Sequence, residues 1–141
     1  MDLRDERKTH TAMQGRLSEA FRGRAKAYAA QIIRLYVKLP KDREETRVLA
    51  KQLLRSGTSV ASHVREASRA RSEDEFVSKL GGALQEADES AFWLELLTEE
   101  CGIAAPLTAE LHSESFELMA IFTTMMNRTR GKQMAESTSQ K

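Results

Sequence analysis

The sequence predicts an all-α protein, arranged as an antiparallel up-down-up-down four-helix bundle. Apolar residues recur at steps of three and four along four long segments, which is the spacing of one helix face. The chain has only two prolines, and neither interrupts one of these segments. The connections between the segments are short, so consecutive helices should pack side by side. An elongated array of helical hairpins is the structural alternative.

The length of 141 residues corresponds to one domain, and 40% apolar with 30% charged residues is ordinary for a helical protein with a core. We expect residues 16–130 to form the bundle and residues 1–15 to form a flexible N-terminal arm. Residues 131–141 have no apolar stripe, so they should form a disordered tail.

The first helix is predicted from about Phe21 to Leu39. Its stripe consists of Phe21, Ala25, Tyr28, Ile32, Leu35 and Leu39. Pro40 follows and should end the helix, because proline has no backbone N–H to donate.

The second helix should run from near Glu44 to about Arg71. Its inner face is predicted to carry Leu49, Leu53, Val60, Val64 and Ala67. Gly57 lies in the middle, where glycine costs about 1 kcal/mol relative to alanine. We therefore expect a neighbouring helix to pack closely against Gly57.

The third helix has the clearest start signal, because Ser72 precedes three consecutive acidic residues. A serine hydroxyl can accept from the first free amides, while the acids face the positive end of the helix dipole. The predicted inner stripe has a period of 3.5 residues, typical of left-handed bundle packing. It consists of Phe76, Leu80, Ala83, Ala87, Ser90, Leu94, Leu97 and Cys101.

The fourth helix is predicted to follow Gly102, which supplies a C-terminal stop, and to begin at Pro106. Its apolar residues are Leu107, Leu111, Phe116, Leu118, Met119, Phe122, Met125 and Met126. We interpret the methionines as core residues that fill gaps.

Charge is distributed unevenly along the chain. Residues 1–71 carry 17 Lys and Arg against 8 Asp and Glu, a net +9, whereas residues 72–141 carry 5 against 13, a net −8. The two halves could neutralise each other inside one monomer. Alternatively, the basic face could meet the acidic face of a neighbouring subunit, or a polyanion.

The residue types predict neither a metal centre nor an enzyme. A di-metal bundle needs Glu-x-x-His pairs, and none of the three histidines lies three residues after a glutamate. The only cysteine, Cys101, should fill the core, and no glycine motif for phosphate binding occurs. We expect no cofactor and no metal. An enzymatic interpretation would need a ligand pocket near His63 and Glu66.

A polar stripe on the second helix is predicted to be structural. Arg55, Ser59, His63 and Glu66 follow one another at steps of four, four and three. They could form hydrogen bonds across the bundle to Glu86, Glu89 or Ser90.

The stronger functional indication is a basic surface. Arg47, Lys51 and Arg55 lie one helical turn apart, about 6 Å, which suits consecutive phosphates. The predicted nucleic-acid-binding set is Arg47, Lys51, Arg55, Arg65, Arg69 and Arg71, and the first helix adds Arg22, Arg24, Lys26, Arg34 and Lys38. Aromatic residues are scarce there, so binding should be directed at the backbone. A simply solvated charged face is the alternative.

Localisation follows from the absence of an apolar segment. The N-terminus is charged where a signal peptide would be apolar, and no uninterrupted apolar run approaches the ~18 residues that span a bilayer. We expect a cytoplasmic protein that does not enter a membrane.

Four strings resemble a known family: residues 27–41, 49–72, 74–97 and 117–122. The most specific features are Arg-Ser-Gly-Thr-Ser-Val at 55–60, Phe-x-x-Lys-Leu at 76–80 and Trp-Leu-Glu-Leu-Leu at 93–97. The sequence is similar to the four-helix bundle proteins named after open reading frames in intervening sequences of bacterial 23S ribosomal RNA. Where that family commonly has asparagine, this chain has His63.

The resemblance implies an antiparallel four-helix bundle, usually of unassigned function. A related branch is the accessory variability protein of diversity-generating retroelements, which forms a pentameric ring and binds nucleic acid and a reverse transcriptase. We therefore expect a non-enzymatic assembly or adaptor protein that forms a small homo-oligomer, for which a pentamer is one candidate. The alternative is an accessory protein that binds the phosphate backbone of RNA or DNA, with a reverse transcriptase as a further candidate partner.

Overall fold

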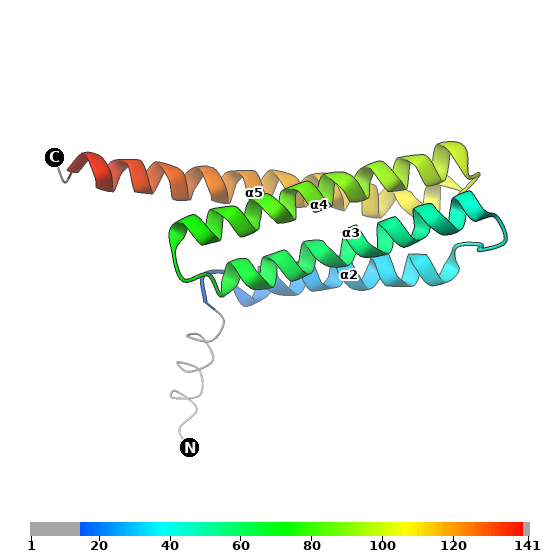
Figure 1. Cartoon of the computed structure of the whole chain (residues 1–141), viewed down its shortest axis with the longest axis horizontal. Coiled ribbons are helices and arrows are strands. Elements are labelled where there is room, and N and C mark those ends of the chain that lie inside the picture. The colour runs from blue at the N-terminus through cyan, green and yellow to red at the C-terminus, as the bar shows by residue number, and fades with distance from the viewer. Residues whose placement is uncertain (1–14, 140–141) are drawn as a thin grey trace, which may run out of the picture.

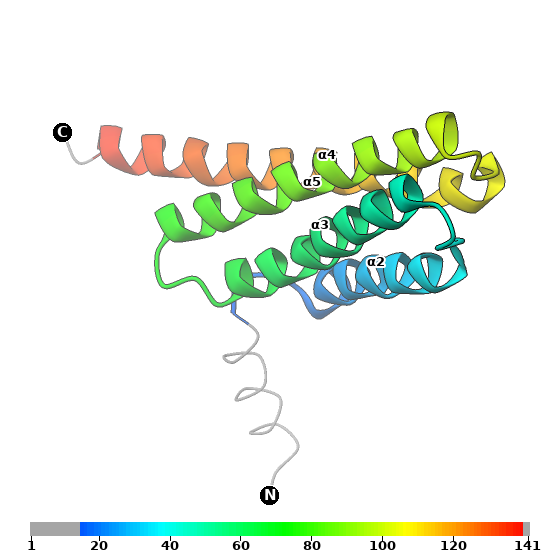
Figure 2. The same cartoon turned by 45° about the vertical axis from the view of Figure 1, so that its right-hand side comes forward.

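The computed structural model describes residues 15–139, which form four α-helices joined by short connections (Figure 1). The helices are α2 (Glu19–Lys38), α3 (Glu44–Ser68), α4 (Glu73–Glu100) and α5 (Ala105–Ser139). Each helix runs antiparallel to the one before it (Figures 1 and 2). The predicted all-α four-helix bundle is confirmed. Residues 1–14 of the predicted arm lie outside the described residues.

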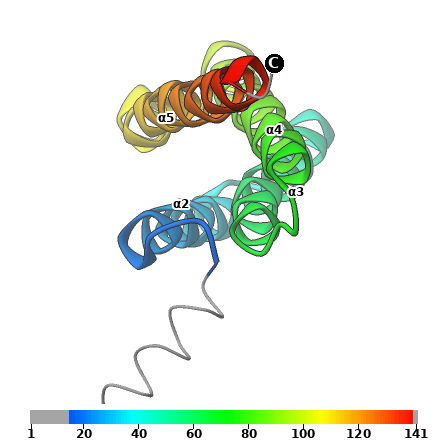
Figure 3. The same ribbon diagram turned by 90° about the vertical axis from the view of Figure 1, so that its left-hand side faces the viewer.

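The helices follow one another around the bundle in chain order, with α3 and α4 between α2 and α5 (Figure 3). Consecutive helices make most of the contacts, and α2 and α5 touch less than they do. Among the described side chains, α2 meets α5 through Phe21 with Phe122, Arg24 with Glu114 and Glu117, and Tyr28 with Ser115. These hydrogen bonds, ion pairs and ring contacts lie in the first half of α2, and Ile32 and Leu35 of its second half belong to the common core.

Local hydrogen bonds define the helix ends. The Ser72 hydroxyl accepts from the Glu75 amide at 3.0 Å, as predicted. Gly102 follows α4 with a φ of +70°, a conformation that favours glycine. Helix α3 ends at Ser68, before the predicted Arg71. Its end is held by Arg16, whose backbone N–H donates to the Ser68 carbonyl at 2.8 Å.

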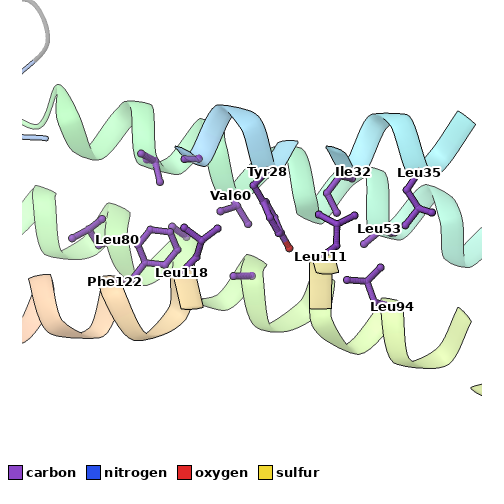
Figure 4. Close-up of a cluster of buried hydrophobic side chains, with 14 of the residues drawn as sticks. Tyr28, Ile32, Leu35, Leu53, Val60, Leu80, Leu94, Leu111, Leu118 and Phe122 are labelled. Carbon is purple, nitrogen blue, oxygen red and sulfur yellow. The ribbon is translucent and has the colours of Figure 1, made fainter. Parts of the chain in front are cut away.

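The inner faces of the helices form one core (Figure 4). Every residue of the predicted α4 stripe, from Phe76 to Cys101, is buried. Gly57 is buried too, and a methyl group there would lie 2.6 Å from the Ile32 side chain. The expected close packing against Gly57 is therefore confirmed, and α2 is the helix that needs the space.

A layer of buried hydroxyl groups crosses the core and takes one residue from each helix. Tyr28 Oη lies 2.6 Å from Ser115 Oγ, and Ser56 Oγ lies 2.7 Å from Ser90 Oγ. Burial raises the pKa of the Tyr28 phenol, and hydrogen bonds with the Ser115 and Ser90 hydroxyls partly oppose this. Since Ser115 donates to the Leu111 carbonyl, Tyr28 is the donor to Ser115. The layer thus joins α2, α3, α4 and α5.

Two of the apolar residues named for the predicted fourth helix are exposed, Leu107 and Phe116. The buried stripe of α5 contains Leu111, Ser115, Leu118, Phe122 and Met126. Ser115 rather than Phe116 occupies the inward position after Leu111, because one helical turn from Leu111 is four residues rather than five. Helical geometry therefore outweighs side-chain hydrophobicity at this turn.

The predicted disordered tail is wrong for residues 131–139, which continue α5. One glycine in an exposed helix costs about 1 kcal/mol and does not end it, and no proline follows. Contacts with the start of α4 support the extension: Gln133 donates to Asp74 at 2.8 Å, and Lys132 lies 3.6 Å from Glu73. The end of α5 projects past α4 (Figure 1). Residues 140–141 lie outside the described residues.

We predict that the Tyr28–Ser115 pair contributes to stability as a unit. Ser115→Ala removes the acceptor of a buried phenol and should lower the free energy of unfolding by about 1–3 kcal/mol, and Tyr28→Phe by about 1 kcal/mol. The double variant should cost less than the sum of the two, by at least about 0.5 kcal/mol. Denaturant unfolding measures all three values.

Ser113→Ala is the matched control, because Ser113 is exposed on the same helix. It should change stability by no more than about 0.5 kcal/mol. Strict additivity of the Tyr28 and Ser115 substitutions would contradict the coupled pair.

Candidate functional site

The outer surface of α3 carries most of the cations predicted to bind nucleic acid. Arg47, Lys51, Arg65 and Arg69 are all exposed. Among the described residues, only Arg47 of these four has a side-chain hydrogen bond, a long one of 3.4 Å to the Lys41 carbonyl. Arg71 lies beyond the end of α3, and its backbone N–H donates to Glu75 at 3.2 Å.

Arg55 differs from the other predicted cations, because acidic residues of α4 engage it. Its guanidinium donates to Glu86 at 3.3 Å and to Glu89. The hydrogen bond to Glu89 is the main cause of a raised Arg55 pKa. Trp93 also donates to Glu89, at 3.2 Å. The structure therefore places Arg55 in a bridge between α3 and α4, and takes it out of the exposed basic set.

The rest of the predicted polar network does not form one connected group. Glu66 pairs with Lys79 at 3.1 Å. The His63 Nδ1–H donates to the Ser59 carbonyl of its own helix at 2.8 Å. The His63 ring lies against α4 at Gly82, where a methyl group would overlap it. The serine that hydrogen-bonds to Ser90 is Ser56, the residue directly after Arg55 in the sequence. The sequence prediction missed this residue.

A groove of about 560 Å³ lies between the first half of α2 and the second half of α3. Its basic residues are Arg22 and Lys26 from α2 and Arg65 and Arg69 from α3. Among the described residues, Glu19 is the only acidic residue that lines it. Sequence reasoning assigned these cations to a basic surface but did not place them in one groove. The sequence pattern that could have indicated the groove is a pair of cations four residues apart on each of two consecutive helices.

The outer surface of α4 and α5 has acidic and aromatic character. His112 Nε2 lies 2.9 Å from Glu95, and the His112 ring contacts Phe116 with centroids 5.1 Å apart. Phe116 is 47% exposed and Phe92 is 51% exposed. Sequence reasoning missed both as surface residues. Their spacing could have predicted this exposure, since neither Phe92 nor Phe116 falls on the buried stripe of its helix.

The two charged halves of the chain meet inside the monomer at Arg24. Its Nε and Nη2 donate to the two carboxylate oxygens of Glu114 at 2.9 and 2.7 Å, and Nη2 also reaches Glu117 at 3.0 Å. The hydrogen bond from Arg24 holds the pKa of Glu114 below its usual value, although burial opposes this. Arg24 and Arg55 of the basic half are thus neutralised by carboxylates of the acidic half within the monomer. Among the described residues, the other cations of α3 have no ion-pair partner.

Other chemistry has little support in the part of the chain that the structure describes. Residues 15–139 contain no cluster of three or more His, Cys, Asp or Glu side chains that could hold a metal ion. No helix within this range is long and apolar enough to cross a membrane. Neither His63 nor Glu66 lines the groove between α2 and α3.

Comparison with known proteins assigns a family but no activity. The family described as 23S rRNA-intervening sequence protein matches residues 21–124. A crystal structure of a protein of unknown function from the S23 ribosomal protein family of Bacteroides thetaiotaomicron is similar to this chain. It shares 33% sequence identity, with a TM-score of 0.67, and the match covers 74% of this chain and 96% of that one. No curated protein sequence matches this chain.

We predict that Glu114→Gln lowers the free energy of unfolding at about pH 7 by roughly 1 kcal/mol, because it removes a bidentate ion pair that is partly exposed. The folded-state pKa of Glu114 is lowered from the usual 4.5. The contribution of the pair is therefore complete above that value and is lost as the pH falls through the lower folded-state pKa. Denaturant unfolding across this range should show the difference between the two proteins shrinking in acid.

Glu110→Gln provides the control, because Glu110 is an exposed glutamate of the same helix. Its stability should follow that of the unsubstituted protein at every pH. A Glu114→Gln deficit that stays constant down to about pH 3 would show that the ion pair is not its source.

Proposed function

This chain belongs to the 23S rRNA-intervening sequence protein family, and we propose that it is a non-enzymatic assembly module that forms a small homo-oligomer. The observation that carries this proposal is a pair of outer faces with exposed apolar residues and opposite charge. The residues of the predicted polar stripe already have structural partners, Lys79 for Glu66 and the helix backbone for His63. We place the assembly in the cytoplasm, because Cys101 is a free, buried cysteine.

The first face, which we call the basic face, is formed by the second half of α2 and the first half of α3. Ile33 is 46% exposed and Val37, one turn later, is 73% exposed. Helices α2 and α3 are consecutive and antiparallel, so the second half of α2 lies beside the first half of α3 (Figure 1). Arg47 and Lys51 therefore supply the charge beside the two aliphatic side chains.

The second face, which we call the acidic face, is formed by α4 and α5. Phe92, Glu95 and Glu99 follow one another at steps of three and four, so they share one side of α4. Glu95 reaches His112, and His112 contacts Phe116. The acidic face thus offers aromatic side chains flanked by carboxylates.

Two different faces on one subunit favour a head-to-tail contact, in which the basic face of one copy meets the acidic face of the next. Burial of apolar area would stabilise the contact at about 25 cal/mol per Å². The opposite charges would select the orientation and increase the association rate. A contact of this heterologous kind closes into a ring when the rotation between subunits permits. A pentamer, as the family resemblance implies, is such a ring.

A second candidate function is backbone-directed binding of RNA or DNA. The specific observation in its favour is that Lys51, Arg65 and Arg69 have no ion-pair partner among the described residues. Cations of this kind can neutralise phosphates and release the counterions bound to them. Arg55 is excluded from this set by its bonds to Glu86 and Glu89.

Native mass tests the assembly. We predict that the protein has the mass of two or more subunits of 15.9 kDa. Val37→Glu alone should weaken the assembly by setting a carboxylate against the acidic face, and Phe116→Lys alone by setting a cation against the basic face. A mixture of the two variants should yield a dimer and nothing larger, because each variant retains one intact face. Light scattering after size-exclusion chromatography measures these masses.

Met134→Glu is the control, because Met134 is exposed near the end of α5, beyond the residues assigned to either face. It should leave the mass unchanged. A monomeric unsubstituted protein would reject the proposal. A mixture of the two face variants that stays monomeric would reject the head-to-tail arrangement.

For the second candidate, we predict that single-stranded RNA binds with an affinity that falls steeply with salt. Lys51→Glu should weaken binding similarly for different RNA sequences and lower the salt slope by about 1. Fluorescence anisotropy over a salt series measures both effects. Lys132→Glu is the matched control, because Lys132 is exposed beside Glu73. Equal weakening by the two variants would argue against a contact at Lys51.

A further inference from the structure

We propose that the groove between α2 and α3 is a binding site for a phosphate group. Arg22, Lys26, Arg65 and Arg69 line it, and within residues 15–139 Glu19 is the only acidic lining residue. The groove lies in the half of α2 before Ile32, apart from Ile33 and Val37. The site therefore goes beyond the assembly proposed above and does not depend on it.

The state of Arg22 points to an anionic ligand. Its Nε and Nη2 are buried and have no hydrogen-bond partner among the described residues. A buried donor without an acceptor is unfavourable, and more so when the group is charged. Arg24, on the same helix, shows how this chain normally satisfies a guanidinium, with bidentate hydrogen bonds to Glu114. Arg22 has the same donors and lacks the carboxylate.

The other lining residues fit a phosphate better than another anion. Arg22 and Lys26 lie one turn apart on α2, and Arg69, which caps the C-terminal end of α3, lies four residues after Arg65. Cations therefore approach the groove from both walls, so a ligand with several acceptor oxygens can engage both walls at once. A guanidinium binds two phosphate oxygens in parallel, and the hydroxyl of Ser62, on the same wall as Arg65, adds a donor.

Electrostatics favours occupation of the groove by an anion. Four like charges close together repel one another, and a single carboxylate does not balance them. A phosphate would neutralise part of this charge and supply the acceptor that Arg22 lacks. The phosphate could belong to a free ligand, such as pyrophosphate, or to the backbone of a single-stranded nucleic acid. Both sources present the same oxygens to Arg22.

Titration of the full chain with two probes at constant ionic strength tests the site: pyrophosphate by calorimetry and a single-stranded RNA oligonucleotide by anisotropy. Arg22→Gln and Arg65→Gln should each weaken binding by about tenfold or more, the effect of losing one charge-assisted contact. Glu19→Gln should strengthen binding, because it removes the one carboxylate that the described residues bring to the groove. Arg34→Gln, an exposed arginine of α2 outside the groove, should behave like the unsubstituted protein.

The outcomes separate the two sources of phosphate. Pyrophosphate binding that is lost in both groove variants supports a free phosphate ligand, and RNA binding alone with the same loss supports a phosphodiester. Absence of binding by either probe would overturn the site, as would equal affinities for Arg65→Gln and Arg34→Gln. Circular dichroism checks folding, and the exposed Arg65 keeps the test decisive if Arg22→Gln unfolds. If the protein is a monomer and binds pyrophosphate, the assembly proposal is rejected and the phosphate site is retained. If it is an oligomer and binds neither probe, the phosphate site is rejected and the assembly is retained.

Discussion

The buried hydroxyl layer is the constraint on which the rest of the bundle depends. Apolar stripes drive helices together but tolerate sliding, since one leucine can replace another along a seam. Tyr28, Ser56, Ser90 and Ser115 lack this tolerance, because each is fully buried and needs its partner at hydrogen-bond distance. One such residue from every helix holds the four helices in a common register. The Gly57–Ile32 contact then sets how closely α2 approaches α3.

A core that satisfies its own polar groups leaves recognition to the outside of the molecule. On the outer surface, the two halves of α2 carry different kinds of exposed side chains. Its first half faces the groove with Arg22 and Lys26, and its second half exposes Ile33 and Val37. The first half is also the part that α5 supports through Arg24 and Tyr28. The second half has no such support from α5, which is consistent with a face that awaits a partner.

Sequence reasoning works best where one helix face decides the outcome. The stripe of α4 could be predicted residue by residue, because burial repeats with a period close to 3.5 and Ser72 marks the start of the helix. The sequence prediction did not separate the inward from the outward residues of α5, where Phe116 is exposed and Ser115 is buried. It also failed for the tail, because the contacts of Lys132 and Gln133 with α4 join residues far apart in the chain.

The sequence by itself determined the fold class, the order of the helices and the division of charge between the two halves, since all three depend on composition and on spacing along the chain. Only the tertiary structure decided which charges remain unpaired. Arg55 and Arg65 look alike in the sequence, yet α4 brings two carboxylates to Arg55, while α2 brings Arg22 and Lys26 to the groove that Arg65 lines. Whether a surface cation is neutralised depends on the neighbouring helix, because electrostatic interactions act through space rather than along the chain.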